Sequence, residues 1–279
     1  MTVLVTGVRG NIGSRVAALL AESGCDVRGS TRDLSEAASP PGIETVELDL
    51  TDPRDAAKAL AGAETVFLYP VRGSIAGFLD AVVASDVQHV VLLSSPAAYE
   101  AGEHDRAIGL AHRAVEEELQ RSGVTHTVLY PSWLATNARR DWGEQIRTRR
   151  RVSMAYPQAQ VNPIHIDDVA EVAVDLLTSP AHRGRMVMIT GPESVPQGEL
   201  VGVLGEVLGA PIAVDELTRE QALVQRAAWM PEPVLEVLLD VAAAAVDVPA
   251  AITNSVERIT GHSSRAFREW VVSHRGDFG

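Results

Sequence analysis

A glycine-rich turn near the N-terminus constrains the fold of this chain more strongly than any other feature of the sequence. The turn follows an apolar strand at residues 3–5 and opens an amphipathic helix. Gly7 permits a tight turn, Gly10 lets backbone N–H groups approach a pyrophosphate, and Gly13 lets the helix pack closely on the strand. The N-terminus of the helix adds partial positive charge. This context predicts a dinucleotide site, rather than a tight turn that binds nothing, formed by Thr6, Gly7, Arg9, Gly10, Asn11, Ile12 and Gly13.

Short β-branched runs alternate with helix-length segments from residue 1 to about residue 130. We expect strands at 3–5, 26–30, 44–48, 65–69, 89–93 and 124–129. This alternation predicts an α/β fold with a doubly wound parallel sheet covered by helices on both faces. After Pro131 we expect a loop-rich stretch to about residue 163, a helix over 167–177 and a strand at 186–190. The remainder is predicted to be mostly helical, near 195–208, 218–229, 233–246 and 263–274.

The composition limits the kind of protein and its partners. The 279 residues are 46% hydrophobic and 22% charged, which is typical of a globular protein. No charge-free apolar stretch reaches the ~20 residues of a membrane span, and the chain enters a strand at once, so we expect a cytoplasmic protein. The net charge of −13 argues against nucleic-acid binding. We interpret the arginine cluster at 147–151 as a solvated loop or lobe edge, and the single Cys25 as a small apolar side chain.

The spacing of the turn, Gly-x-x-Gly-x-x-Gly preceded by Thr, resembles that of extended and atypical short-chain dehydrogenase/reductases. The likeness is greatest to the NmrA-like branch and extends over the whole chain, including the helix around Arg265–Trp270. It implies a Rossmann domain at 1–131, completed by about 164–192. The segments 132–163 and 193–279 would then form a small, mostly helical substrate lobe. It also implies a monomer or homodimer that binds a small-molecule substrate.

The residues after the second strand predict which dinucleotide binds. NAD-binding proteins carry an acid there that accepts hydrogen bonds from the ribose 2′-hydroxyl, and that acid would repel a 2′-phosphate. This chain has Thr31 and Arg32 instead, and Arg9 projects toward the same region. Because arginine pairs with phosphate, we expect NADP, whereas the alternative is a solvated Arg32. The resemblance adds adenine contacts at Asp49 and Leu50 and a further nucleotide contact at Ser94. It also adds contacts with the nicotinamide ribose, which are Leu68, Tyr69 and Pro70.

The usual catalytic pair of short-chain reductases, Tyr-x-x-x-Lys, is absent. None of the four tyrosines has a lysine four residues later, and Lys58 is the only lysine. By the resemblance, Ser95 helps to bind the reacting carbonyl. His112 occupies the lysine position and Ile108 the tyrosine position. The histidine titrates near neutral pH. The structural alternatives are a serine that caps its own loop and a helix histidine that fills space.

Further residues are predicted to contact the substrate. The resemblance implicates Tyr99, Trp133, Asn137 and His165. Tyr130 stands where the family usually has an arginine, so an anion contact at that point does not follow from the resemblance. Trp142, Trp229 and Met230 either line an apolar cleft or belong to the core. Asp167 and Asp168 are interpreted as caps of the following helix, and the spacing of these groups predicts no metal site.

The favoured function is NADPH-dependent hydride transfer to a conjugated acceptor such as a quinone or an enone. Such acceptors yield a stabilised enolate or phenolate and depend less on a strong acid, which explains the missing tyrosine. Two alternatives remain at this point. One is a non-catalytic protein that senses NADP, and the other is an isomerase or cyclisation enzyme that uses His112 and Ser95 without net redox chemistry.

Overall fold

The computed structural model describes residues 1–35, 41–98 and 109–279, and the chain divides into two compact units. Unit 1 comprises Met1–Glu100, Gly109–Pro131 and Asp167–Met188. Among the described residues, unit 2 comprises Ser132–Ile166 and Ile189–Gly279. Tyr99 and Ile108, to which the sequence assigns roles, lie outside the described residues.

Unit 1 is built on the seven-stranded sheet, with strand order β3-β2-β1-β4-β5-β6-β9. The pairs of neighbours from β3 to β6 are all parallel, as in Leu4 opposite Val66 and Leu93 opposite Leu129. This sheet confirms the predicted doubly wound α/β fold. The strands are β1 Thr2–Val5, β2 Asp26–Thr31, β3 Glu44–Glu47, β4 Thr65–Leu68, β5 His89–Leu93, β6 His126–Pro131 and β9 Met186–Ile189.

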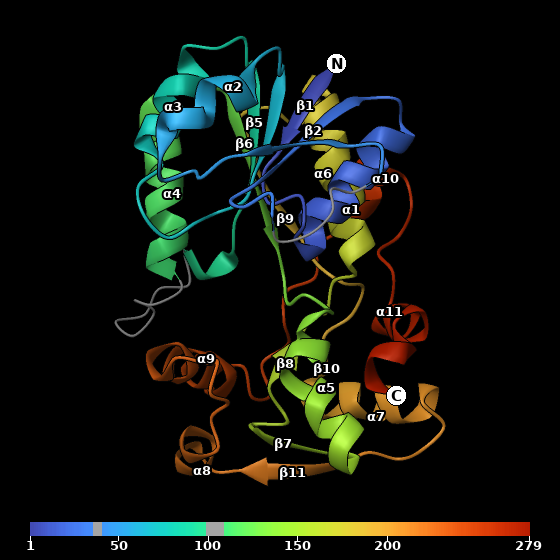
Figure 1. Ribbon diagram of the computed structural model, residues 1–279. Coiled ribbons are helices and arrows are strands. Elements are labelled where there is room, and N and C mark those ends of the chain that lie inside the picture. Colours follow the sequence, from blue (N-terminus) through green and yellow to red (C-terminus); the bar gives the residue numbers. More distant parts are fainter. Residues whose placement is uncertain (36–40, 99–108) are drawn as a thin grey trace. The chain divides into compact units, whose positions relative to one another are not determined.

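Helices cover both faces of this sheet. α2, α3 and α4 lie on one face, whereas α1 and α6 lie on the other (Figure 1). Between the sheet and α2–α4, buried apolar side chains such as Leu4, Phe78, Leu92 and Leu119 form one core. Strands covered on both sides need apolar residues in succession, and every residue of β5 is buried. The helices are α1 Asn11–Glu22, η1 Pro53–Asp55, α2 Ala56–Leu60, α3 Ala76–Val83, η2 Pro96–Ala98, α4 Gly109–Ser122, α6 Ile166–Thr178 and η3 Pro180–His182.

Unit 2 combines helices with two small sheets. β8 pairs with β10 in antiparallel fashion, and β7 pairs with β11 in parallel. An aromatic cluster forms part of its core, in which the buried Trp270 stacks on Phe267 with ring centres 5.7 Å apart. The elements are α5 Asn137–Arg149, β7 Arg151–Ala155, β8 Gln160–Val161, β10 Val195–Pro196, α7 Gln197–Val207, β11 Ala213–Leu217, α8 Arg219–Val224, α9 Glu232–Ala244, α10 Ser255–Thr260, α11 Phe267–Ser273 and η4 Arg275–Phe278.

The predicted loop-rich stretch after Pro131 is wrong, because α5 occupies 13 residues of it and β7 follows. The helix is rich in arginine, and of its 13 residues it buries Ala138, Trp142, Gly143 and Ile146. An apolar stripe this narrow, set among charged residues, gives a weak helical pattern. Over the described residues, no helix has the length and apolar character needed to cross a membrane.

Candidate nucleotide site and adjoining polar cluster

The glycine-rich turn leaves β1 and enters α1 with a backbone that only glycine accommodates well. Gly7 has a φ of 64°, in the left-handed region. Gly10 is the N-cap of α1, and its N–H donates to the carbonyl of Gly7 at 2.8 Å. A Cβ atom on Gly13 would overlap the carbonyl oxygen of Gly7. The close approach that Gly13 permits is therefore to the turn itself, and α1 begins directly from this turn, as in a phosphate-binding loop.

The turn is fixed to its neighbouring strands. Thr6 is buried, its hydroxyl donates to the carbonyl of Phe67 at 3.0 Å, and its Oγ1 accepts from the Tyr69 N–H at 2.7 Å. Val8 is buried over β2, where Gly29 makes room for it, because a Cβ atom there would lie 2.7 Å from the Val8 methyl groups. The carboxyl ends of β1, β2 and β4 thus define the position of the turn.

At the carboxyl end of β2, the structure brings together the residues predicted to distinguish NADP from NAD. The Arg9 guanidinium donates to the Asp33 carbonyl at 2.6 Å and to the Thr31 hydroxyl at 3.4 Å. Arg32 is exposed and makes no hydrogen bond or ion pair within the described part of the chain. The hydroxyl and N–H of Ser35 hold the pKa of the Asp33 carboxyl below its usual value. The Asp33 carboxylate therefore already accepts hydrogen bonds from Ser35.

The other predicted nucleotide contacts lie at the same sheet edge. Asp49, exposed after β3, accepts hydrogen bonds from the N–H and hydroxyl of Thr51, and these lower the pKa of its carboxyl. Leu50 and Leu68 have buried side chains, so their backbones face the edge rather than their side chains. Tyr69 is exposed directly after β4, and its Cβ would lie 3.6 Å from a Cβ atom on Gly7. Pro70 follows it, half-buried.

A cluster of buried polar side chains lies where β5 ends. The Ser94 hydroxyl donates to the Glu116 carboxylate, and Ser94 Oγ is 3.4 Å from His112 Nδ1. The Tyr130 hydroxyl donates to the second carboxylate oxygen of Glu116 at 2.9 Å. Ser94, Glu116 and Tyr130 are 4%, 7% and 3% exposed. These four residues form the His112 cluster, at the same sheet edge as the turn because β1 and β5 run parallel.

The His112 cluster follows from the local sequence. His112 and Glu116 lie four residues apart on α4, so their side chains share a helix face. Ser94 and Tyr130 come from adjacent strands, because the N–H of Ser94 donates to the carbonyl of Leu129 at 2.8 Å. Glu116 and Tyr130 were not among the predicted site residues. The four-residue spacing between His112 and Glu116 was the sequence signal that could have predicted Glu116 as a partner of His112.

Ser95 points elsewhere within unit 1. Its hydroxyl oxygen accepts from the N–H of Ala97 at 3.3 Å, and its carbonyl accepts from Ala98, so it caps the short helix η2. It is half-buried, and its predicted contact with a substrate carbonyl stays a prediction. Ser94, predicted only as a nucleotide contact, is the serine that lies against His112.

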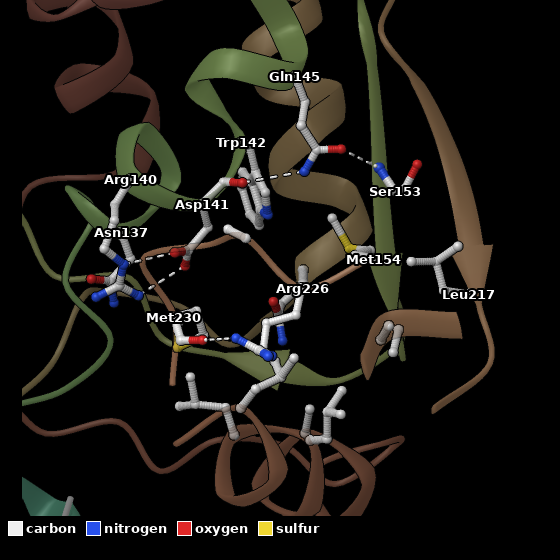
Figure 2. A pocket seen from close by; sticks show the side chains of 18 of the residues that line it. Asn137, Arg140, Asp141, Trp142, Gln145, Ser153, Met154, Leu217, Arg226 and Met230 are labelled. Atoms are coloured by element: carbon white, nitrogen blue, oxygen red, sulfur yellow. Dashed lines mark hydrogen bonds and ion pairs between the residues drawn. The ribbon is translucent and has the colours of Figure 1, made fainter. Parts of the chain in front are cut away.

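Unit 2 contains a cavity of about 660 Å³ that includes two of the predicted substrate contacts, Trp133 and Asn137. Its walls come from α5, β7, α8 and α9 (Figure 2). Trp133 packs on Trp142 with ring centres 5.8 Å apart, and Trp229 is 54% exposed with the Arg140 guanidinium 5.8 Å from its ring centre. The apolar lining also includes Met154, Leu217, Met230 and Leu239.

Polar groups stand at defined points of the cavity wall. Gln145 accepts from the Ser153 N–H at 3.0 Å, while its amide donates to the Asp141 carbonyl at 3.2 Å. Arg226 donates to the Met230 carbonyl at 2.7 Å (Figure 2). Its Nε is buried and has no hydrogen-bond partner among the described residues. Because that nitrogen is not accessible from the cavity, the largely apolar, aromatic lining is what defines the ligand, and it suits a flat ring system.

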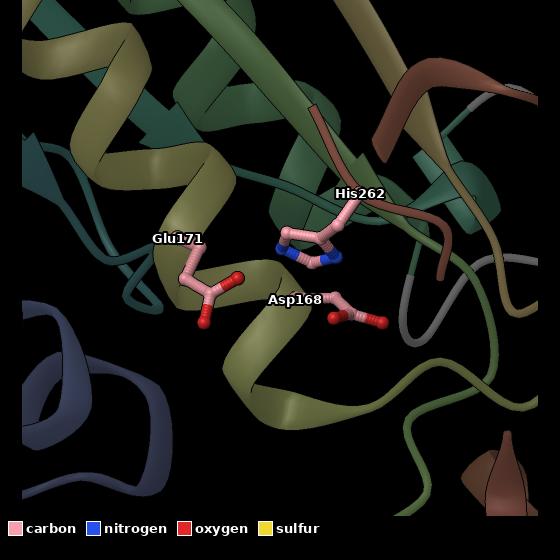
Figure 3. Close-up of side chains that lie close together, drawn as sticks. All are labelled: Asp168, Glu171 and His262. Atoms are coloured by element: carbon pink, nitrogen blue, oxygen red, sulfur yellow. The ribbon is translucent and has the colours of Figure 1, made fainter. Parts of the chain in front are cut away.

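Two remaining predicted groups are buried or paired. His165, a predicted substrate contact in unit 2, is 5% exposed. Asp167 lies in the first turn of α6 and pairs with Arg15 at 2.7 Å. Asp168 and Glu171 lie along the same helix (Figure 3), and His262, also drawn, belongs to unit 2, where its Nδ1 is 2.9 Å from the Ser263 carbonyl oxygen. Two carboxylates on one helix do not by themselves define a metal site.

Comparisons with known proteins agree with this fold and with the nucleotide turn. A family model described as NAD(P)H-binding matches residues 7–180. A (4-alkanoyl-5-oxo-2,5-dihydrofuran-3-yl)methyl phosphate reductase of Streptomyces griseus is 32% identical over 99% of both chains. An NAD(P)H azoreductase of Xenophilus azovorans is 29% identical, again over 99% of both.

Solved structures share the fold at lower identity. An NADPH-dependent quinone oxidoreductase of Escherichia coli superposes with a TM-score of 0.80 at 19% identity, over 99% of this chain and 100% of that one. A triphenylmethane reductase of Citrobacter gives 0.82 at 18% identity, over 98% and 99%. The fold and the turn thus define a Rossmann-type nucleotide-binding protein. The chain belongs to the NAD(P)H-binding family, alongside NAD(P)-dependent reductases.

Proposed function

We propose that the protein is an NADPH-dependent reductase that transfers a hydride to a conjugated acceptor such as a quinone or an enone. The observation that carries the proposal is the position of His112 beside Ser94, at the sheet edge that also bears the glycine turn. A proton-exchanging side chain at that edge suits a reaction in which reduction leaves a negative oxygen. Both whole-length relatives have names that refer to reduction of unsaturated groups, an oxo-dihydrofuran and an azo compound.

The residues of unit 1 fit the dinucleotide. The turn from Gly7 to Gly13 would hold the pyrophosphate, and Arg32 together with Arg9 would hold the ribose 2′-phosphate. Asp49 and Leu50 would contact adenine, and Tyr69 would lie near the nicotinamide ribose. The bound nucleotide supplies the hydride. The preference for NADP over NAD rests on Arg32, which is exposed and, within the described residues, interacts only electrostatically with the carboxylate of Asp49.

The acceptor's apolar body is proposed to bind in the cavity of unit 2. Its tryptophan walls suit a flat ring system. Trp133 and Asn137 line this cavity, Ser95 and His165 remain proposed contacts, and Tyr99 lies outside the described residues. We further propose that the protein is cytoplasmic, acts as a monomer or homodimer, and binds neither metal nor nucleic acid.

One set of measurements tests the function. NADPH and NADH affinities are measured by calorimetry on the purified protein, and NADPH oxidation is followed with quinones, enones and cationic dyes. Turnover with a conjugated acceptor supports the proposal. Tight NADPH binding without turnover would instead favour the sensor, and conversion of an enone without NADPH consumption would favour an isomerase.

A further inference from the structure

We propose that Glu116, with Ser94 and Tyr130, positions His112 to deliver the proton that follows hydride transfer. This inference rests on the proposed reductase function, and it assigns His112 as the proton donor and Glu116 as a positioning residue. It concerns the His112 cluster alone, whose members all belong to unit 1.

The carboxylate of Glu116 is fixed from two sides. One oxygen accepts from the Tyr130 hydroxyl at 2.9 Å and the other accepts from the Ser94 hydroxyl. Because the Tyr130 bond holds the carboxylate in one orientation and all three groups are buried, the Ser94 hydrogen is committed to Glu116. Only the lone pairs of Ser94 Oγ are then available to His112.

This commitment selects one form of the imidazole ring. Ser94 Oγ lies 3.4 Å from His112 Nδ1, and an oxygen that offers only lone pairs bonds to nitrogen that carries a hydrogen. The ring is therefore held with hydrogen on Nδ1, and Nε2 is the nitrogen that gains and loses a proton. Without Glu116, the Ser94 hydroxyl can reverse, and the ring can adopt the other tautomer.

The reaction balances with this arrangement. The hydride brings two electrons and one hydrogen to the acceptor's conjugated carbon, and the electrons displaced through the conjugated system leave a negative charge on its oxygen. The protonated ring of His112 gives the Nε2 hydrogen to that oxygen. The neutral ring keeps its Nδ1 hydrogen on Ser94 and regains a proton from solvent.

The alternative is that the cluster merely ties α4 to β5 and β6. Acceptors that differ in their need for a proton separate the two roles. A quinone or an enone requires a proton on oxygen after reduction, whereas a cationic triphenylmethane dye becomes a neutral product by hydride addition alone. If Glu116 acts in proton delivery, its substitution should slow the reduction of quinones and enones and leave the reduction of the cationic dye unchanged.

The experiment compares Glu116→Gln, which keeps the side-chain volume, with Glu117→Gln, a control at an exposed position of the same helix. We expect Glu116→Gln to lower kcat with an enone or quinone at least tenfold, while kcat with the dye and the Kd for NADPH change less than twofold. Tyr130→Phe, which removes the hydrogen bond that orients the Glu116 carboxylate, is a second variant with the same expected pattern. An equal loss with both acceptors, or no loss with the enone, overturns the inference.

A spectroscopic measurement decides the point independently of turnover. With ¹⁵N-labelled histidine in the NADPH-loaded protein at about pH 8, where an ordinary imidazole is neutral, we expect His112 to carry its hydrogen on Nδ1. His112→Gln assigns the signal, and Glu116→Gln should abolish this preference. Hydrogen on Nε2 in the unmodified protein overturns the inference. If no acceptor is reduced, the reductase proposal fails, and the tautomer still tests the positioning.

Discussion

A Cβ atom on Gly13 would overlap the carbonyl oxygen of Gly7, six residues earlier in the same turn. The first turn of α1 therefore closes on the backbone of the preceding loop, and any side chain at Gly13 pushes the two apart. Since the turn is fixed by Thr6 to β4, the displacement would be transmitted to the nucleotide edge of the sheet.

Gly13→Ala is expected to destabilise the protein by about 2 kcal/mol, the range of steric overpacking, even though alanine favours helix over glycine. It should also weaken NADPH binding. Urea unfolding and calorimetry measure the two effects. The matched control is Gly202→Ala, because a Cβ atom at this position of α7 meets nothing within 4 Å. Similar stability for both variants would contradict the predicted clash.

Arg32→Ala is expected to remove most of the preference for NADPH over NADH. Losing a charge-assisted contact with the 2′-phosphate costs roughly 1.5 to 3 kcal/mol, which corresponds to about tenfold or more in the Kd. The Kd for NADH should stay within twofold. Arg54→Ala, an exposed arginine after β3 that pairs with Asp52, serves as the charge-matched control. Equal affinities for the two nucleotides in the unmodified protein would refute the assignment.

His89 is expected to make the protein less stable as the pH falls. It is buried in β5, its Nε2 is 2.9 Å from the Thr127 hydroxyl oxygen, and that hydroxyl donates to the His182 carbonyl. Nε2 must therefore carry the hydrogen, and Nδ1 is buried without a partner among the described residues. Burial, followed by the charges of Arg183 and His126, lowers the pKa of His89 from 6.5 to about 4.

Because the pKa is lower in the folded state, the stabilisation is complete above pH 6.5 and is lost between pH 6.5 and 4, by up to about 3 kcal/mol. Urea unfolding across this range measures the slope. His89→Gln should remove the contribution of one bound proton from the slope of unfolding free energy against pH. His182→Gln, at a half-exposed position, should leave this slope unchanged. Parallel slopes in all three proteins would show that His89 titrates normally.

Trp229→Ala is expected to raise the KM for bulky aromatic acceptors roughly threefold to tenfold, the equivalent of one aromatic contact. The KM for a small enone should change little. Because Trp229 is 54% exposed, the substitution should leave the unfolding midpoint almost unchanged. Val224→Ala, at an 86% exposed position of α8, is the control. A uniform effect on large and small acceptors would argue against a ring-binding wall.

The sequence was sufficient for the sheet and for the glycine turn, because both depend on local patterns. Residues 90–93 of β5 form an uninterrupted apolar run, and the positive φ of Gly7 follows from the motif itself. The helix α5 was missed because its apolar stripe is narrow. The His112 cluster was only half visible, since Glu116 is local to His112 whereas Ser94 and Tyr130 come from adjacent strands. Hydrogen bonds between side chains from separate elements follow from tertiary packing, which the sequence pattern does not specify.

Unit 1 is assembled from three stretches of chain, and this discontinuity determines which fragments are viable. A fragment that ends at Pro131 lacks α6 and β9, so β6 becomes an exposed edge strand and the sheet loses a helix from one face. Such a fragment would tend to self-associate. Replacing unit 1 by another Rossmann domain would therefore require several joints in one chain, those at residues 131/132, 166/167 and 188/189 among them, so a single crossover cannot exchange either unit.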